Sequence, residues 1–362
     1  MKKHIASILF LFLLSTFQLI AQSHSVKRLG IEQGLSNNYV VSITQDKQGF
    51  LWFATEEGLN KFDGTRFTTY YKNDLTQDNQ GITGNELNRV YADTKHPIIW
   101  IATQRDGLNA YNYNEQTFTA YQHNPENPHS LITNDVTDIA PSTQHDDGLW
   151  ISTYYRGIEY LDITSGQFTH YNKSTVPSLP CDQTWTVLDG GDGNLYIGHV
   201  GSGFSIFSPK DKSVKNFRNE AGNPMSLPGN DVFCIIKDAN GNIWLGTNNG
   251  LALYDAANEN FITFKNNKND KYATLCSRIL SIRQLKDNRL WIASELNGIA
   301  ILNLKQSMFL SPEEISLEYI QEGADNRSLS NASARCIFQD SFDNIWIGTW
   351  GGGINFISSK QP

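Results

Sequence analysis

Asp238 to Asp255 reads Asp-Ala-Asn-Gly-Asn-Ile-Trp-Leu-Gly-Thr-Asn-Asn-Gly-Leu-Ala-Leu-Tyr-Asp, and versions of this stretch recur along the 362-residue chain. Each version carries one aromatic anchor, and successive anchors lie 46 to 55 residues apart. A regular spacing with one aromatic anchor per unit indicates a repeat architecture. The seven anchors are Trp52, Trp100, Trp150, Tyr196, Trp244, Trp291 and Trp346.

The residues around each anchor predict four short strands per unit. Asp-x-x-Gly before the anchor, as in Asp238 to Gly241, favours a hairpin, because Asp hydrogen-bonds the nearby backbone and Gly tolerates a positive φ. Ile243 to Thr247 carries large residues on both faces, which is typical of a strand covered on both sides. Four antiparallel strands in a repeat of about 40 to 50 residues are typical of a β-propeller blade. A second turn glycine follows each anchor, at Gly58, Gly107, Gly157, Gly203, Gly250, Gly298 and Gly353.

The two ends of the chain predict how the ring closes. Val26 to Leu29 precedes the first complete unit, whereas Ala334 to Phe338, Ile345 to Thr349 and Gly353 to Ile357 give the last unit only three strands. We therefore predict that the N-terminal strand becomes the outer strand of the last blade, which removes the free sheet edges. The expected fold is an all-β, seven-bladed propeller of four-stranded blades, a single domain over residues 22–362.

The first 21 residues predict an exported protein. Lys2 and Lys3 precede an apolar run from Ile5 to Leu14, as in a secretory signal peptide. An uncleaved membrane anchor is the alternative, although the apolar run is short for a spanning helix. Removing residues 1–21, whose only charges are the two lysines, takes the formal net charge from −8 to −10. Such an acidic chain is not expected to bind nucleic acid.

Four cysteines in an exported chain raise the question of disulfides. Cys181 and Cys276 lie at equivalent positions in blades two apart, as do Cys234 and Cys336. Such positions should be too far apart for a bridge, which requires Cα atoms within about 7 Å. We expect buried free thiols. The longest spacing between anchors comes from extra residues around Phe309 to Glu318, which predict a lengthened outer hairpin.

The repeats resemble a known family. The opening Gly34-Leu35-Ser36-Asn37-Asn38, the stretch from Asp46 to Thr55 and the recurring hairpin Asp/Gly, Trp, Gly-Thr and Gly-Leu are similar to two-component regulator propeller repeats over about residues 25–357. Those repeats form the periplasmic sensor region of hybrid histidine kinases in Bacteroidetes-type bacteria. The resemblance implies a periplasmic propeller that recognises oligosaccharides released from complex glycans.

The family's usual kinase, receiver and membrane modules do not follow Pro362, so the resemblance implies a detached or truncated sensor module without catalytic activity. Its expected partners are an oligosaccharide and, as open possibilities, a second propeller, a kinase-bearing protein or a second copy of the chain. No cofactor or metal is expected. His123, His129 and Glu126 lie close in sequence, but their spacing matches no standard metal motif.

The predicted ligand site lies on the face formed by the loops between strands two and three of each blade. Aromatic rings stack on the apolar faces of sugars, while Arg supplies several fixed donors to hydroxyls or carboxylates. Bulky residues replace the short polar ones of other units at several of these loops. The residues predicted to line the site are Tyr154, Tyr155, Arg156, His199, Trp350 and Arg105.

Two other functions remain open. A lyase could use His199 with Glu56 or Glu295 as an acid–base pair, an analogy based on the fold alone. A propeller that serves as a protein-interaction platform is the second alternative. The chain contains no Gly-x-Ser-x-Gly, His-Glu-x-x-His or phosphate-loop motif that would indicate a common hydrolase or nucleotide-binding enzyme.

Overall fold

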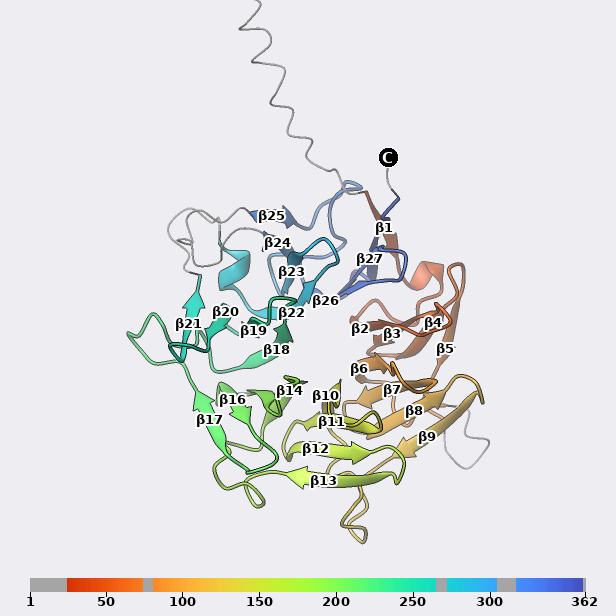
Figure 1. The fold of residues 1–362 in the computed structure, drawn as a ribbon. Helices are drawn as coiled ribbons and strands as arrows, with labels where there is room; N and C mark the ends of the chain where they lie inside the picture. Colours follow the sequence, from red (N-terminus) through yellow and green to blue (C-terminus); the bar gives the residue numbers. More distant parts are fainter. Residues whose placement is uncertain (1–24, 74–80, 265–271, 305–316, 361–362) are drawn as a thin grey trace, which may run out of the picture.

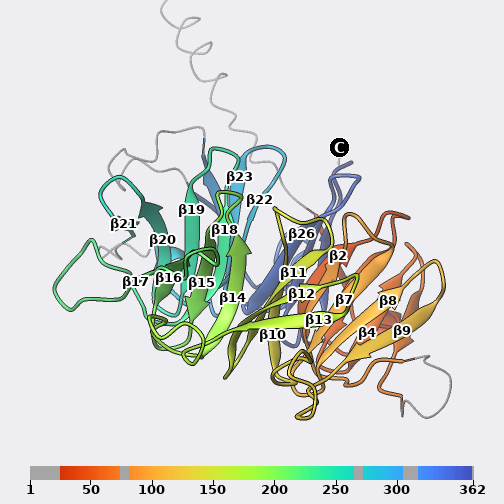
Figure 2. The same cartoon turned by 60° about the horizontal axis from the view of Figure 1, so that its bottom comes forward.

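A computed structural model describes residues 25–73, 81–264, 272–304 and 317–360. Seven four-stranded antiparallel sheets form a ring (Figure 1), which confirms the predicted seven-bladed β-propeller. In blades 1 to 6 the first strand in the sequence lies innermost and the last lies at the rim, whereas in blade 7 β26 is innermost and β1 lies at the rim. Figure 2 shows the inner strands around the middle of the ring and the outer strands at its edge.

Each of the seven sheets runs from an inner strand outward to the rim. Blade 1 comprises β2 (Val40–Gln45), β3 (Leu51–Thr55), β4 (Gly58–Phe62) and β5 (Phe67–Tyr70). Blade 2 comprises β6 (Leu87–Ala92), β7 (Ile98–Thr103), β8 (Leu108–Asn112) and β9 (Thr117–Tyr121). Blade 3 comprises β10 (Val136–Pro141), β11 (Gly148–Thr153), β12 (Gly157–Asp162) and β13 (Gln167–Tyr171). Blades 4 and 5 comprise β14 (Thr184–Asp189), β15 (Leu195–His199), β16 (Phe204–Phe207) and β17 (Val214–Phe217); and β18 (Val232–Lys237), β19 (Ile243–Thr247), β20 (Gly250–Asp255) and β21 (Asn260–Thr263). Blades 6 and 7 comprise β22 (Ile279–Gln284), β23 (Arg289–Ser294), β24 (Ile299–Asn303) and β25 (Leu317–Ile320); and β26 (Ala334–Gln339), β27 (Ile345–Thr349), β28 (Ile354–Ile357) and β1 (Val26–Leu29). Two single-turn 3₁₀ helices, η1 (Ile31–Gln33) and η2 (Thr274–Cys276), lie in the connections.

The ring closes as predicted, because β1 is the outer strand of blade 7. It pairs antiparallel with β28, with Val26 opposite Ile357 and Leu29 opposite Ile354. Arg28 reinforces this closure, since its Nη2 donates to four backbone carbonyls of the loop between β25 and β26. The shortest of these hydrogen bonds, to Gly323, is 2.6 Å. The first and last strands of the described chain therefore belong to the same sheet.

The hairpin Asp and the Trp anchor form one hydrogen-bonded unit. In blade 1, Oδ1 of Asp46 accepts the backbone N–H groups of Gln48 and Phe50, each at 2.9 Å, and Oδ2 accepts the indole N–H of Trp52 at 2.8 Å. Blades 5 and 7 repeat this indole contact through Asp238 and Asp340. This unit explains the recurring sequence, since one carboxylate shapes the hairpin and pairs the polar atom of a buried indole.

In the five blades that carry a Thr at the end of the second strand, this Thr and the second turn Gly also act together. The Thr247 hydroxyl donates to the Gly250 carbonyl at 2.8 Å, and Gly250 has φ +127°. A Cβ on that glycine would lie 2.9 Å from the Leu275 carbonyl oxygen, so a larger residue would be both strained and crowded. All seven predicted turn glycines have positive φ.

The hydrophobic core lies between neighbouring blades rather than within one. Trp244 of blade 5, for example, belongs to a buried cluster that includes Leu290 and Ile292 of blade 6. All seven anchors are buried, with exposed fractions of 8% or less. Each blade therefore depends on its neighbours for burial, as expected for a repeat protein.

The four cysteines are free, as predicted. Cys336 is buried, but Cys181, Cys234 and Cys276 keep partial exposure, so the prediction of full burial is confirmed for Cys336 alone. The inner-strand thiols of Cys234 and Cys336 are shielded from the bulk, and burial raises the pKa of each to about 12. Both thiols are thus protonated and unreactive at neutral pH.

Two predictions concern residues outside the described part of the chain. The signal peptide falls within residues 1–24, and most of the expected insertion falls within residues 305–316. Within the described ranges, no helix has the length and apolar character required to cross a membrane.

Candidate functional site

A β-bulge near the start of every inner strand shapes the centre of the ring. In β14, for example, the register with β15 shifts between Thr184 and Thr186, which leaves Trp185 as the extra residue. The same shift occurs in all seven blades. A bulge re-aims a side chain, and all seven extra residues line a central cavity of about 670 Å³. They are Val41, Asn88, Thr137, Trp185, Phe233, Leu280 and Arg335.

Aromatic rings line one side of the mouth of this cavity. Tyr155 and Tyr154 follow β11 on the blade 3 loop, with their ring centroids 4.3 Å apart. Tyr154 is 6.1 Å from Trp185, and Trp185 is 5.8 Å from Phe233, both with edge-to-face geometry. Three blades thus contribute to a continuous row of four rings.

Charged residues continue this row around the mouth. The Arg278 guanidinium lies 4.5 Å from the centre of the Phe233 ring and 3.3 Å from the Glu295 carboxylate. Arg335 lies 4.3 Å from the centre of the Trp350 ring, and Trp350 contacts Tyr39 edge-to-face at 4.7 Å. We call the whole set the mouth arc: Tyr39, Tyr154, Tyr155, Trp185, Phe233, Arg278, Glu295, Arg335 and Trp350.

Acidic groups at the mouth are held in a partly dry environment. Burial raises the pKa of Glu56, an effect that Arg335 opposes and Glu86 reinforces. Burial likewise raises the pKa of Asp135, opposed by Arg105. Burial lowers the pKa of Arg335 from its usual range. The mouth therefore offers both hydrogen-bond donors and acceptors, and water is partly excluded from them. Polar contacts between these groups and a ligand are stronger there than at an open surface.

Three of the predicted site residues are brought together. Tyr154, Tyr155 and Trp350 belong to the mouth arc. Arg105 and Arg156 have exposed side chains on the loops of blades 2 and 3. Like Tyr154 and Tyr155 they lie outside the cavity lining, but only the two tyrosines are connected by ring contacts to Trp185. The two arginines lie at the border of the site.

His199 is a correction, because it is buried and does not face the mouth. It ends β15 at the position that Thr occupies in blades 1, 2, 3, 5 and 7. Its Nε2 is 2.8 Å from the Ser205 hydroxyl, and its Nδ1 is 3.5 Å from the Cys181 sulfur. Burial lowers the pKa of His199 to about 4, so it is neutral at pH 7. The sequence shows the substitution but not that this position points into the blade.

Sequence reasoning missed Trp185, Phe233, Arg278 and Arg335. One signal was available for Trp185, since the chain has eight Trp residues and six of them are anchors. The two that remain, Trp185 and Trp350, both lie in the mouth arc. Nothing comparable marks Phe233 or Arg335, because each reaches the channel only through a bulge that shifts the strand register by one residue.

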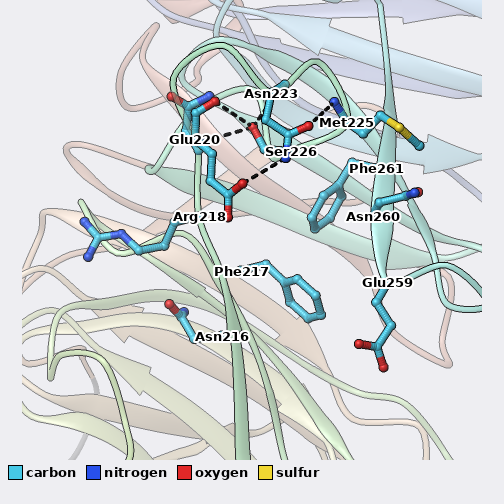
Figure 3. Close-up of a pocket in the computed structure, with 11 residues that line it drawn as sticks. Asn216, Phe217, Arg218, Glu220, Asn223, Met225, Ser226, Glu259, Asn260 and Phe261 are labelled. Atoms are coloured by element: carbon cyan, nitrogen blue, oxygen red, sulfur yellow. Dashed lines mark hydrogen bonds between the residues drawn. The ribbon is translucent and has the colours of Figure 1, made fainter.

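A second hollow lies at the rim between blades 4 and 5 (Figure 3). It has a volume of about 410 Å³ and lies between β17, β21 and the loop around Asn223. The loop's polar groups bond each other: Ser226 donates to the Glu220 carbonyl, and Asn223 donates to the Glu220 carboxylate at 2.8 Å. These contacts stabilise the loop and leave few groups to hold a ligand, so the mouth arc is the stronger candidate site.

The described residues contain no group of three or more His, Cys, Asp or Glu side chains arranged to hold a metal ion. His123, close to His129 and Glu126 in the sequence, has its Nδ1 2.8 Å from the Leu131 carbonyl oxygen instead. The imidazole thus contributes to the structure of its loop.

Comparison with known proteins agrees with this architecture. The model of the two component regulator propeller family matches residues 34–57, 226–249 and 328–351. The chain is 64% identical, with a TM-score of 0.84, to the extracellular domain of a hybrid two component system from B. thetaiotaomicron. That match covers 94% of this chain and 42% of the other.

More distant similarities concern shorter stretches or the fold alone. Histidine kinase P4 from Formosa agariphila is 42% identical over 66 residues, which are 18% of this chain and 5% of the kinase. A streptogramin B lyase has a TM-score of 0.65 at 12% identity, covering 92% of this chain and 97% of the lyase, a likeness of fold only. The chain spans less than half the length of the two sensor proteins that it matches. The chain thus carries two component regulator propeller repeats in a seven-bladed ring, and it is similar to the extracellular domain of a hybrid two component system.

Proposed function

We propose that this propeller is the ligand-binding sensor module of a hybrid two-component signalling system, and that it binds glycan-derived oligosaccharides at the mouth arc. The observation that carries the proposal is the row of four aromatic rings next to stacked guanidinium groups. The similarity to an extracellular sensor domain supports the signalling role. An exported, periplasmic location is part of the same proposal.

The chemistry of the mouth arc suits sugars. A pyranose ring has apolar C–H faces that pack on aromatic rings and a rim of hydroxyls that need donors and acceptors. Tyr155, with 54% of its surface exposed, offers a free ring face, and Trp350 offers a partly exposed indole beside Arg335. Each stacking or hydrogen-bonding contact should contribute on the order of 1 to 3 kcal/mol, so its loss should weaken binding roughly 5- to 150-fold.

Titration calorimetry over a panel of plant and host oligosaccharides tests this proposal. We expect at least one member of the panel to bind and its affinity to fall by roughly 5- to 150-fold in Tyr155→Ala and Trp350→Ala. Arg156→Ala, at the border of the site, should have a smaller effect. Lys212→Ala is the control, because Lys212 lies in the turn between β16 and β17 on the opposite face. Binding that depends on Lys212 and not on Tyr155 or Trp350 would place the ligand on that opposite face.

The same incubations address the lyase alternative. The proposal expects oligosaccharide lengths to remain unchanged by chromatography. The lyase hypothesis needed His199 as a base at the surface, and the buried, neutral imidazole does not meet this need. Cleavage that persists in purified protein would refute a purely binding role.

Signal transmission requires a further partner in this proposal. A second propeller, a kinase-bearing protein or a second copy of the chain could respond to the bound ligand. Light scattering with and without the oligosaccharide that binds in calorimetry would detect a ligand-dependent homodimer. An unchanged mass would favour a partner of a different kind.

A further inference from the structure

The lumen below the mouth arc contains a guanidinium group with no carboxylate beside it. Arg283 lies on β22 opposite the anchor Trp291, at the position that faces the channel. Of the residues that the structure describes, none forms an ion pair or hydrogen bond with the Arg283 guanidinium, which lies 5.8 Å from the centre of the Phe338 ring. The Arg283 side chain is exposed to the lumen, so its guanidinium donors remain available to a ligand.

The residues at the position of Arg283 in the other inner strands form one layer of the channel lining with it. Each blade contributes one residue to this layer, the one paired with its anchor. Most of them are apolar and offer no side-chain acceptor to the Arg283 guanidinium. Besides Arg283, they are Thr44, Tyr91, Ala140, Leu188, Ile236 and Phe338.

A second guanidinium lies one layer nearer the mouth. Nε of Arg89 forms an ion pair with Asp138 at 3.1 Å, and 47% of the Arg89 side chain remains exposed to the lumen. The carboxylate of Asp138 is already engaged, because it also accepts the Thr186 hydroxyl at 2.7 Å and the backbone N–H of Ile139 at 2.9 Å. Arg89 therefore has guanidinium donors left for another acceptor.

The balance of charge inside the lumen is opposite to that of the whole chain. The chain carries a formal net charge of −8. The lining of the central cavity holds four cations against three carboxylates: Arg89, Lys237, Arg283 and Arg335, and Glu56, Glu86 and Asp138. Partial desolvation within the lumen and the nearby Arg89 both hold the pKa of Arg283 below its usual range, which agrees with two cations facing a shared space. The central cavity of this acidic chain thus carries a small excess of positive charge.

We propose that this lumen is an anion-binding site, in which Arg283 and Arg89 hold a carboxylate or sulfate group carried by a sugar residue of the ligand. The inference rests on the proposed function and narrows it: the preferred oligosaccharides are acidic or sulfated. The mouth arc stacks on the sugar rings, and the anionic substituent points down the channel. Guanidinium groups suit this task, because they bind carboxylate and sulfate oxygens through paired N–H donors.

Inorganic sulfate tests the lumen without any knowledge of the sugar. Thermal unfolding is followed while sulfate replaces chloride at constant ionic strength. Sulfate stabilises most proteins weakly and without saturation, whereas a specific site gives a saturable rise in Tm. We expect the saturable rise in the wild type, its loss in Arg283→Gln and its reduction in Arg89→Gln. Arg66→Gln is the matched control, because it makes the same charge change at an exposed hairpin.

The stability of the variant provides an independent reading. Since Arg283 has no compensating partner, Arg283→Gln in chloride alone should melt at the wild-type temperature or above it. A markedly lower Tm would show that Arg283 has a structural role, and would overturn the inference. So would the absence of a saturable sulfate effect in the wild type, or an equal effect in Arg283→Gln.

Matched sugars then identify the source of the anion. Trigalacturonate is compared with its neutral methyl ester, and a sulfated galactose disaccharide with its desulfated form, which is neutral. The charged member that fits should bind at least about 10-fold more tightly than its neutral counterpart, and Arg283→Gln should remove that difference. If neutral oligosaccharides bind at the mouth arc and charge brings no gain, the proposed function stands and the anion site fails. If sulfate stabilises the lumen while no sugar responds to Tyr155→Ala or Trp350→Ala, the proposed function fails and the anion site stands.

Discussion

The guanidinium carbon of Arg335 lies 4.3 Å from the centroid of the Trp350 ring, and this contact joins β26 to the loop after its neighbour β27, on the blade 7 side of the mouth. Arg335 comes from the bulge of β26, and Trp350 follows β27. The stacked pair holds a flat cation and an indole in fixed positions before any ligand arrives. Such preorganisation reduces the entropy that binding would otherwise lose at these side chains.

The two tryptophans of the mouth arc should be the ones accessible to solvent. The six Trp anchors are at most 7% exposed, whereas Trp185 and Trp350 are partly exposed. We therefore expect acrylamide to quench a minor fraction of the wild-type fluorescence and to quench very little in the double variant Trp185→Phe, Trp350→Phe.

An exposed residue of similar size elsewhere provides the control for this measurement. Phe342, at 68% exposure, lies in the hairpin before β27, on the opposite face, and Phe342→Leu should leave the quenchable fraction unchanged. Undiminished quenching in the double variant would mean that an anchor, not the mouth arc, is the accessible tryptophan.

The fold could be predicted in detail because its determinants are local and repeat. Asp46 and Trp52 lie six residues apart and bond each other directly, so their spacing in the sequence reports a real contact. The closure by β1 could be predicted too, because the last repeat lacks one strand and the chain has one strand left over. Burial of the anchors follows from the same repetition.

The site could be predicted only in part, because it depends on which way a residue points. Tyr154, Tyr155 and Trp350 follow a strand end, where the loop face can be inferred. Trp185 and Arg335 lie within strands, where a β-bulge sets the direction of each side chain. No Gly, Pro or other turn residue in the sequence indicates that bulge. His199 was wrongly placed in the site, because a histidine is a common site residue. It occupies the position of the recurring Thr and is buried inside the blade.

Ring closure should depend on Arg28. Its Nη2 lies within 3.3 Å of four carbonyl oxygens of the loop before blade 7, and β1 has no other side chain with such contacts in the described structure. Arg28→Ala should lower Tm by several degrees, because those carbonyls lose a shared charged donor. Thermal unfolding followed by circular dichroism measures the change.

Lys27 provides a neighbouring comparison, since its side chain is exposed on the same strand. Lys27→Ala should leave Tm within about a degree, as expected for a surface position with no such contacts. Deleting residues 22–30 should be more severe than either substitution, with a lower Tm or aggregation, because it exposes the edge of β28. Unaltered melting after that deletion would show that β1 does not stabilise the ring.

The hairpin Asp of a blade should stabilise the fold more than an ordinary surface carboxylate does. Asp46→Ala leaves the buried indole N–H of Trp52 and two backbone N–H groups without their acceptor. Each unpaired buried donor costs about 1 to 3 kcal/mol, so the free energy of unfolding should fall by at least about 2 kcal/mol in urea titrations. Asp63→Ala is the control, because Asp63 accepts a similar set of bonds in an exposed turn where water can replace it. Equal losses in the two variants would contradict this account of the anchor.

Buried His199 should make the protein sensitive to mild acid. Burial lowers its pKa to about 4 in the folded state, below the ordinary value of 6.5, so folding disfavours the protonated imidazole. The stability contributed by the neutral form is complete above pH 6.5 and is lost as the pH falls from 6.5 towards 4, by up to about 3 kcal/mol. His199→Thr restores the residue that most other blades carry and removes this titration. Over that pH range, the free energy of unfolding should therefore fall less steeply in His199→Thr than in the wild type, whatever their difference at pH 7. His145→Gln, at an exposed position, should keep the wild-type slope, and parallel curves for wild type and His199→Thr would show that His199 does not titrate in this range.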